Sequence, residues 1–230
     1  KNEVQEMLEN VLGAFYKYQK SVHSRNFVLH SCQLFTIYDA CQSLKLGGSE
    51  DDVKRIMYQV ETGEGKTFII LLIAAVLSKM SSNATKIHIA SSNIMLSKRD
   101  YEDSYNFIKA IGLESAILLH KNELPSDSDA INKYYKGPYY EDDIFDNSLK
   151  MNYDISCIYG PCDKSDNRLK TQPDIIFSTF ANFESLYLRM MEKLPRVTVG
   201  YFKDCYLIID EADAILIDEL ANGTVLSHPM

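Results

Sequence analysis

The sequence feature that most constrains the fold is the glycine-rich hexapeptide Thr62-Gly63-Glu64-Gly65-Lys66-Thr67. Its glycines let the backbone bend tightly, so that successive amide groups can point inward at phosphate oxygens. Lys66 adds a mobile positive charge for the β- and γ-phosphates, and Thr67 offers a hydroxyl to a magnesium ion. Such a loop is expected between a strand and a helix. We therefore predict a strand over residues 55–61 and a helix from the loop to about Met80.

A second chemical landmark lies far along the chain, where the apolar run Tyr206–Ile209 is followed by Asp210 and Glu211. Ligands of parallel α/β sheets bind at the carboxyl ends of the strands, so we expect Asp210 to lie beside the phosphate loop. There it could reach a magnesium ion held by Thr67, while Glu211 could orient an attacking water. An acidic helix start is the alternative interpretation, because carboxylates stabilise that end of a helix without any further role.

The segments between these landmarks alternate between strand and helix patterns, which favours a mostly parallel sheet with helices on both faces. Further strands are expected over residues 86–91, 115–120, 154–159 and 174–179, and further helices over 93–111 and 180–193. Residues 121–153 break this rhythm, because they are acidic and dotted with tyrosines. We expect them to form a solvated loop insertion within a domain that spans residues 47–230.

Residues 1–46 have a helical pattern and are expected to form an N-terminal segment that packs on this domain. In residues 2–20 the apolar side chains recur at three- and four-residue spacing, at Val4, Met7, Leu8, Val11, Leu12, Phe15 and Tyr18. A second helix is expected over residues 27–46, and its buried side chains are predicted to be Val28, Leu34, Phe35, Tyr38, Cys41 and Leu44.

Net charge, cysteine content and the length of the apolar runs limit the kinds of protein that this chain can be. The net charge of −8 argues against a general nucleic-acid-binding protein, which needs a basic surface. Five cysteines without regular spacing indicate reduced thiols in a cytosolic compartment. The longest apolar run, residues 68–77, is too short to span a bilayer and predicts a buried helix. The chain begins at Lys1 rather than Met, so we expect a piece of a longer protein.

Several segments, in the right order, resemble the SecA family of preprotein translocase ATPases. Val60–Thr67 is similar to that family's phosphate loop, and Asn93–Asp100 to its N-D-Y-L-A-x-R-D segment. Phe183–Arg189 resembles its F-x-x-D-Y-L-R segment. The most specific match is Asp210–Glu219, which is similar to D-E-V-D-S-I-L-I-D-E almost throughout.

The resemblance implies a RecA-like P-loop NTPase domain, the first nucleotide-binding domain of the SecA motor, with ATP or ADP and Mg²⁺ as cofactors. Thr62, Gly63, Glu64, Gly65, Lys66 and Thr67 would bind the nucleotide, Thr67 and Asp210 the metal, and Glu211 would act as catalytic base alongside Lys66. Gln42 resembles the family's adenine-reading glutamine, whose amide can both donate to and accept from the base. The gap from Gln42 to the phosphate loop is a few residues longer than in the family.

The implied partners are the rest of a SecA-like motor and, through further domains, a polypeptide substrate and a membrane translocon. The implied location is cytoplasmic, at the periphery of a membrane. Departures from the family pattern, such as Ile94-Met95 in place of aspartate and tyrosine, lie on the partner side. Two alternatives stay open: a DEAD-box-like RNA helicase domain, and a SecA-derived module that binds partners without catalysis.

Overall fold

The protein is described by a computed structural model that places residues 2–23, 27–45, 55–81, 86–120, 123–135, 137–138, 157–160, 173–193 and 205–215. The elements in chain order are α1 (Glu3–His23), α2 (Ser31–Lys45), α3 (Lys66–Met80), β1 (Lys86–Ser91), α4 (Ile94–Ala110), β2 (Ser115–Leu119), α5 (Ser128–Tyr134), β3 (Gly137–Pro138), β4 (Cys157–Gly160), β5 (Ile175–Thr179), α6 (Phe180–Lys193) and β6 (Cys205–Ile209).

The strands form one sheet in the order β3-β4-β2-β5-β1-β6. Strands β2, β5, β1 and β6 run parallel to one another, while β4 runs antiparallel to both β2 and β3. The predicted mostly parallel sheet is therefore confirmed. Because β5, β1 and β6 are neighbours, the chain segments that follow them emerge at the same edge of the sheet.

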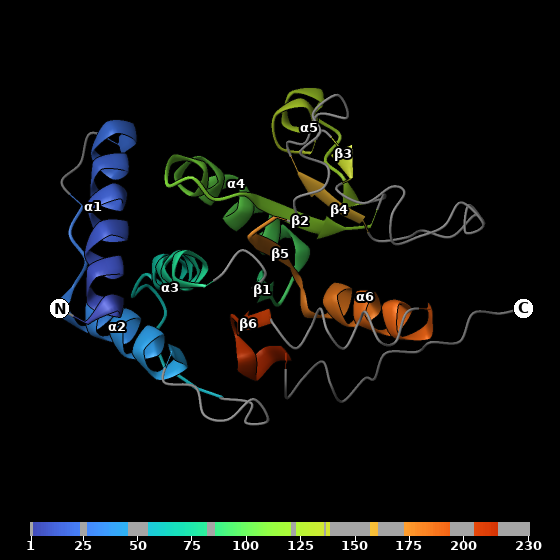
Figure 1. The fold of residues 1–230 in the computed structure, drawn as a ribbon. Helices are drawn as coiled ribbons and strands as arrows, with labels where there is room; N and C mark the ends of the chain where they lie inside the picture. The colour runs from blue at the N-terminus through green and yellow to red at the C-terminus, as the bar shows by residue number, and fades with distance from the viewer. Residues whose placement is uncertain are drawn as a thin grey trace, which may run out of the picture.

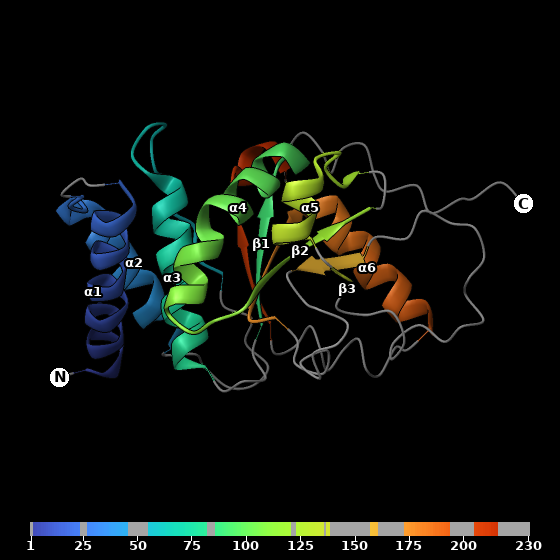
Figure 2. The same ribbon diagram turned by 90° about the horizontal axis from the view of Figure 1, so that it is seen from above.

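Helices cover both faces of the sheet, as predicted (Figures 1 and 2). Side chains alternate between the two faces along each strand. Ile89 and Phe177 lie in the larger hydrophobic core with residues of α3 and α4, whereas Ala90 and Ile176 lie in a smaller core with residues of α6. Helices α1 and α2 form an outer layer that packs on α3.

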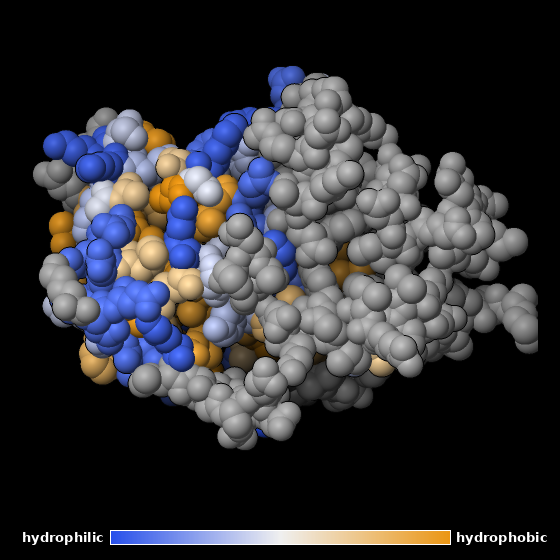
Figure 3. Space-filling view, in the orientation of Figure 1, coloured by the Kyte–Doolittle hydropathy of each residue, from blue (hydrophilic) through white to orange (hydrophobic). Residues whose placement is uncertain are grey.

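Phe15 anchors α1 to this architecture. Its ring is fully buried and makes edge-to-face contacts with Phe27, Phe68 and Phe107, at centroid distances of 5.6, 5.7 and 5.3 Å. Phe68 belongs to the first turn of α3 and Phe107 to α4, so one aromatic cluster joins three helices. In the space-filling view, hydrophobic residues gather between α1 and α3 (Figure 3). The buried face predicted for α1 is confirmed at Val4, Leu8, Val11 and Phe15.

The strand predicted over residues 55–61 is wrong, since none of these residues is in a strand. A strand needs a neighbour for its ladder of hydrogen bonds, and β6 pairs only with β1 in the described sheet. Within this stretch Tyr58 contacts α2, where its hydroxyl donates to Asp39 at 2.6 Å. Met57 is 82% exposed.

Two side-chain predictions also need correction. In the second helix the expected apolar face is confirmed at Cys41, which is buried, and at Leu34, Tyr38 and Leu44, which pack against the core. It is wrong at Phe35 and at Val28, which precedes the helix, since both are exposed, while Gln33 is buried. Within the expected solvated loop, residues 128–134 form α5, and Tyr135 is buried against Tyr101 of α4 with ring centroids 5.8 Å apart. Tyr134 is the last residue of α5, and the three remaining tyrosines of that loop, Tyr139, Tyr140 and Tyr153, lie outside the described residues.

Candidate active site

The glycine-rich loop leads directly into α3. Gly63 and Gly65 have φ angles of 90° and 74°, in the left-handed region that residues with a Cβ atom rarely adopt. The carbonyl of Gly65 accepts hydrogen bonds from Phe68 and Ile69, which makes Lys66 the first helical residue. The first N–H groups of a helix have no partner within it and carry the positive end of its dipole. The predicted turn into a helix is present, and binding of phosphate at its N–H groups stays a prediction.

Gln33 of α2 holds this loop in shape. Its side-chain Nε2 donates to the carbonyl of Glu64 at 2.7 Å, and its Oε1 accepts from the backbone N–H of His30 at 2.8 Å. A Cβ atom on Gly65 would lie only 2.8 Å from the same Nε2. Gln33 was missed from the sequence because no motif marks it and its partner, Glu64, is 31 residues away along the chain.

The predicted adenine-reading residue, Gln42, lies near the other end of α2. Its Oε1 accepts from the side chain of Asn2 at 2.6 Å. An adenine contact by Gln42 stays a prediction. Gln33, at the start of the same helix, is the glutamine that donates a hydrogen bond to the phosphate loop.

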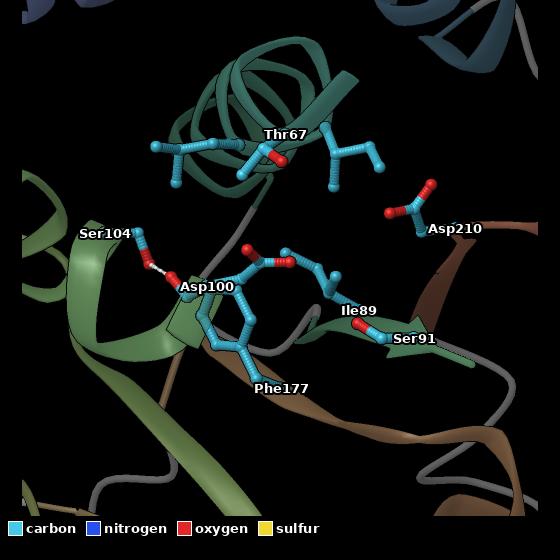
Figure 4. A pocket seen from close by; sticks show the side chains of 9 residues that line it. Thr67, Ile89, Ser91, Asp100, Ser104, Phe177 and Asp210 are labelled. Carbon is cyan, nitrogen blue, oxygen red and sulfur yellow. Dashed lines mark hydrogen bonds between the residues drawn. The ribbon is translucent and has the colours of Figure 1, made fainter. Parts of the chain in front are cut away.

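Thr67 and Asp210 line one small pocket, although they come from opposite ends of the sequence (Figure 4). Ser91 and Asp100 line it as well, above a floor that includes Phe177. The carboxylates of Asp100 and Asp210 and the hydroxyl of Thr67 point toward the same space (Figure 4). The free space is about that of a single water molecule. The convergence of Thr67 and Asp210, predicted because ligands of parallel sheets bind at the carboxyl ends of the strands, is present.

Asp210 follows β6 and is tied to the neighbouring strand, because its N–H donates to the carbonyl of Ala90 at 2.8 Å. Burial raises the pKa of its carboxyl group, and the nearby charge of Glu211 raises it further. A hydrogen bond from the Glu211 N–H and the charges of Lys66 and Arg99 act in the opposite direction on that pKa. The positive charge of Lys66 therefore acts on the Asp210 carboxylate, and this interaction connects the acidic segment with the phosphate loop.

Glu211 has a φ of 56°, the only positive φ of a non-glycine residue in the described chain. Such a backbone costs about 1 to 3 kcal/mol and persists where surrounding contacts impose it. One contact is the hydroxyl of Ser92, which donates to Glu211 Oε2 at 2.5 Å. Because Ser92 follows β1 and Glu211 follows β6, adjacent strands hold this exposed carboxylate at the edge of the pocket.

Asp100 enters the pocket from α4. The side chain of Asn93 caps this helix by accepting from the N–H of Leu96 at 3.0 Å. Asp100 is 7% exposed, and burial raises its pKa, opposed mainly by a hydrogen bond from Arg99. The segment was noted in the sequence only as part of a family resemblance, and neither Asp100 nor Ser91 was given a role.

The described residues offer little for a metal cluster or a membrane span. Within the described residues, no three or more His, Cys, Asp or Glu side chains lie close enough together to hold a metal ion. In the same part of the chain, no helix is long and apolar enough to cross a membrane. In the described residues the candidate site is the pocket beside the phosphate loop, which Thr67, Ser91, Asp100 and Asp210 line with hydroxyl and carboxylate groups.

Comparison with known proteins agrees with this geometry. The model of the SecA DEAD-like domain family matches residues 52–230. The protein translocase subunit SecA of Fervidobacterium nodosum is 26% identical to this chain over 184 residues. The SecA subunit of Thermosipho melanesiensis is 27% identical over 195 residues. Each of these two matches covers 74% of this chain. The SecA subunit of Anaplasma marginale is 24% identical over 172 residues, which cover 75% of this chain. The chain spans only 21%, 21% and 15% of these three relatives. The family match covers most of the sequence, including the phosphate loop and the acidic segment, and the chain belongs to the SecA DEAD-like domain family.

Proposed function

We propose that this chain binds ATP at the phosphate loop and contributes to its hydrolysis as the first nucleotide-binding domain of a SecA-type motor. The observation that carries the proposal is the shared pocket of Thr67 and Asp210, with Lys66 close enough to act on the pKa of Asp210. Phosphoryl transfer depends mainly on positioning and on neutralising charge. The groups around this pocket are of the kinds that supply both.

In this proposal the backbone of residues 62–67 cradles the phosphates, and Lys66 offsets the charge of the β- and γ-oxygens. Thr67 and Asp210 would hold a Mg²⁺ ion, which supplies further neutralisation of phosphate charge when it is bound. An oxygen-only set of carboxylate and hydroxyl groups suits Mg²⁺. Glu211 would orient the attacking water and accept its proton.

The relatives named above are translocase subunits of which this chain spans a small part. We therefore extend the proposal to a polypeptide as the cargo and to further motor parts, a membrane translocon among them, as the partners. The site would then work on the cytoplasmic side. Slow hydrolysis by this chain alone is expected, because motors of this class draw part of their catalytic machinery from a second nucleotide-binding domain.

Calorimetric titration with MgATP of a Glu211→Gln variant tests the proposal. Glutamine keeps the size of the side chain but cannot accept the proton, so the variant should bind ATP and turn it over at least about a hundredfold more slowly than the unchanged chain. Failure of both proteins to bind ATP or ADP would contradict the proposal and favour a non-catalytic interaction module. Strong stimulation of hydrolysis by RNA would favour the helicase alternative instead.

The shape of the loop gives a further prediction. Gly65→Ala should weaken ATP binding by about tenfold or more, because a left-handed alanine costs about 1 to 2 kcal/mol and its Cβ would displace Gln33 from Glu64. Gly63→Ala should have the smaller effect, since it has the strain (φ 90°) but no atom within 4 Å of the new Cβ. Titration calorimetry of both variants provides the measurement.

A double variant separates the two causes. Removing the Gln33 side chain removes the clash, so Gln33→Ala combined with Gly65→Ala should lose less affinity than the sum of the single losses. Gly13→Ala is the control, because that helical glycine has nothing within 4 Å of a new Cβ and lies in α1. Equal effects of Gly65→Ala and Gly63→Ala would mean that Gln33 moves away freely and does not shape the loop.

A further inference from the structure

The hydroxyl of Ser91 is an unexplained group in the pocket. Ser91 is 2% exposed, and its Oγ has no hydrogen-bond partner among the described residues. A buried polar group without a partner costs about 1 to 3 kcal/mol, so its presence calls for a ligand or another compensating contact. The side chain lies at the pocket wall and its hydroxyl is directed into the pocket (Figure 4).

The sheet places Ser91 next to Asp210. In the parallel pairing of β1 with β6, Ala90 is opposite Ile209, so the next residues, Ser91 and Asp210, continue the same register. The hydrogen bond from the Asp210 N–H to the Ala90 carbonyl keeps the strands together at this point. Ala90 and Ile209 both face α6, so Ser91 and Asp210 face the opposite side, toward α3 and α4.

Asp100 approaches the same space from α4. Arg99 contacts it at 3.0 and 2.7 Å, and both contacts go to Oδ1. Oδ2 is therefore left for a ligand in the pocket. Arg99 itself is largely exposed, with 55% of its side chain accessible, so water weakens its pairing with the buried carboxylate. Two carboxylates, Asp100 and Asp210, thus face one confined space that contains no side-chain cation among the residues lining it.

We propose that Asp100 and Ser91 complete a divalent-cation site with Thr67 and Asp210, and that this site binds the metal ion before nucleotide arrives. Its four protein groups are hard oxygen donors, the class that Mg²⁺ and Mn²⁺ prefer. The cation relieves the repulsion between the two carboxylates and gives the Ser91 oxygen a partner. The proposal deepens the proposed nucleotide site, on which it rests for its purpose, but it makes a claim that holds without nucleotide.

The size of the pocket sets the preference among ions. A space of about one water admits a small ion in direct contact with protein oxygens rather than a fully hydrated ion. Mg²⁺ loses its water reluctantly. Mn²⁺ should therefore bind more tightly than Mg²⁺, and the larger Ca²⁺ less tightly than either.

The test is a titration of the nucleotide-free, chelator-treated chain with Mn²⁺, followed by electron paramagnetic resonance of the free ion. One bound Mn²⁺ per chain is expected. Asp100→Asn should weaken it by about tenfold or more, the scale seen when a group supporting a metal site is lost. Ser91→Ala should weaken it by a smaller factor, and Lys66→Ala should not weaken it.

Matched controls are available on the same helix. Asp103→Asn removes an exposed carboxylate of α4, and Ser97→Ala removes another buried, unpartnered hydroxyl of α4 that does not line the pocket. Both should bind Mn²⁺ like the unchanged chain. Far-UV circular dichroism checks that each variant folds, and if Asp100→Asn does not, the comparison of Ser91→Ala with Ser97→Ala decides.

Absence of Mn²⁺ binding without nucleotide would overturn the inference, and so would equal binding by Asp100→Asn and Asp103→Asn. If ATP binds normally in either case, the proposed function stands while the inference fails. If Mn²⁺ binds as expected but neither ATP nor ADP does, the cation site stands while the proposed function fails.

Discussion

Replacing Lys66 with alanine is expected to abolish ATP binding within the range of titration calorimetry. Hydrogen bonds between charged groups contribute about 1.5 to 3 kcal/mol, so losing the lysine should cost about ten- to a hundredfold in affinity. Lys66 is the first residue of α3 and lies close enough to Asp210 to lower the pKa of that carboxyl group. Its removal therefore also leaves the acidic pocket more negative, which repels the phosphates further.

Lys79→Ala is the matched control, since Lys79 lies in the last turn of the same helix, away from the loop. This variant should bind ATP like the unchanged chain. Unchanged binding by Lys66→Ala would refute the assignment of the phosphate loop. Equal losses in the two variants would point to a general effect of charge rather than to a specific contact.

The sequence predicted the site best where the residue types of a motif and its place beside a helix or strand indicate the same structure. Glycines with a lysine and a threonine predict a left-handed turn into a helix, and the structure has that turn at Gly63 and Gly65. The apolar run before Asp210 predicts a buried strand; the structure has β6 there, although it is the last strand of the described sheet and Leu207 is 48% exposed. Its parallel pairing with β1 places the acidic segment at the edge where the loop lies. Neither inference needed knowledge of which strand is adjacent to which.

Predictions failed where the outcome depends on a neighbour that the local pattern does not specify. The apolar-leaning stretch over residues 55–61 resembles a strand, but no strand of the described sheet pairs with it. In α2, helical spacing identified Phe35 as buried, whereas the structure buries Gln33, which is satisfied by Glu64 and His30. A polar side chain can replace an apolar one in a core when its hydrogen bonds are met there, and spacing alone does not reveal those partners.

The groups proposed to hold the cation were missed for a related reason. Asp100 lies two turns into a helix and Ser91 at the end of a strand, and neither position follows a short motif with a known mechanism. Their juxtaposition depends on how α4 packs against β1 and β5. Only the three-dimensional arrangement shows that a second carboxylate faces Asp210.

The largest effect on stability is expected at Phe15, where Phe15→Ala should lower the free energy of unfolding by about 3 to 5 kcal/mol, as for other buried phenylalanines. The ring is fully buried and touches Phe68, two residues beyond Lys66, so its loss should also weaken ATP binding.

Phe35→Ala is the control, because that ring is 68% exposed, and a change within about 0.5 kcal/mol is expected. Urea unfolding followed by circular dichroism measures both variants. A single shifted transition in Phe15→Ala would support the prediction that residues 1–46 pack on the domain that contains the sheet, since the cavity would then weaken both parts together. Two transitions, of which only one moves, would show that the N-terminal helices are a separate unit and do not support the phosphate loop.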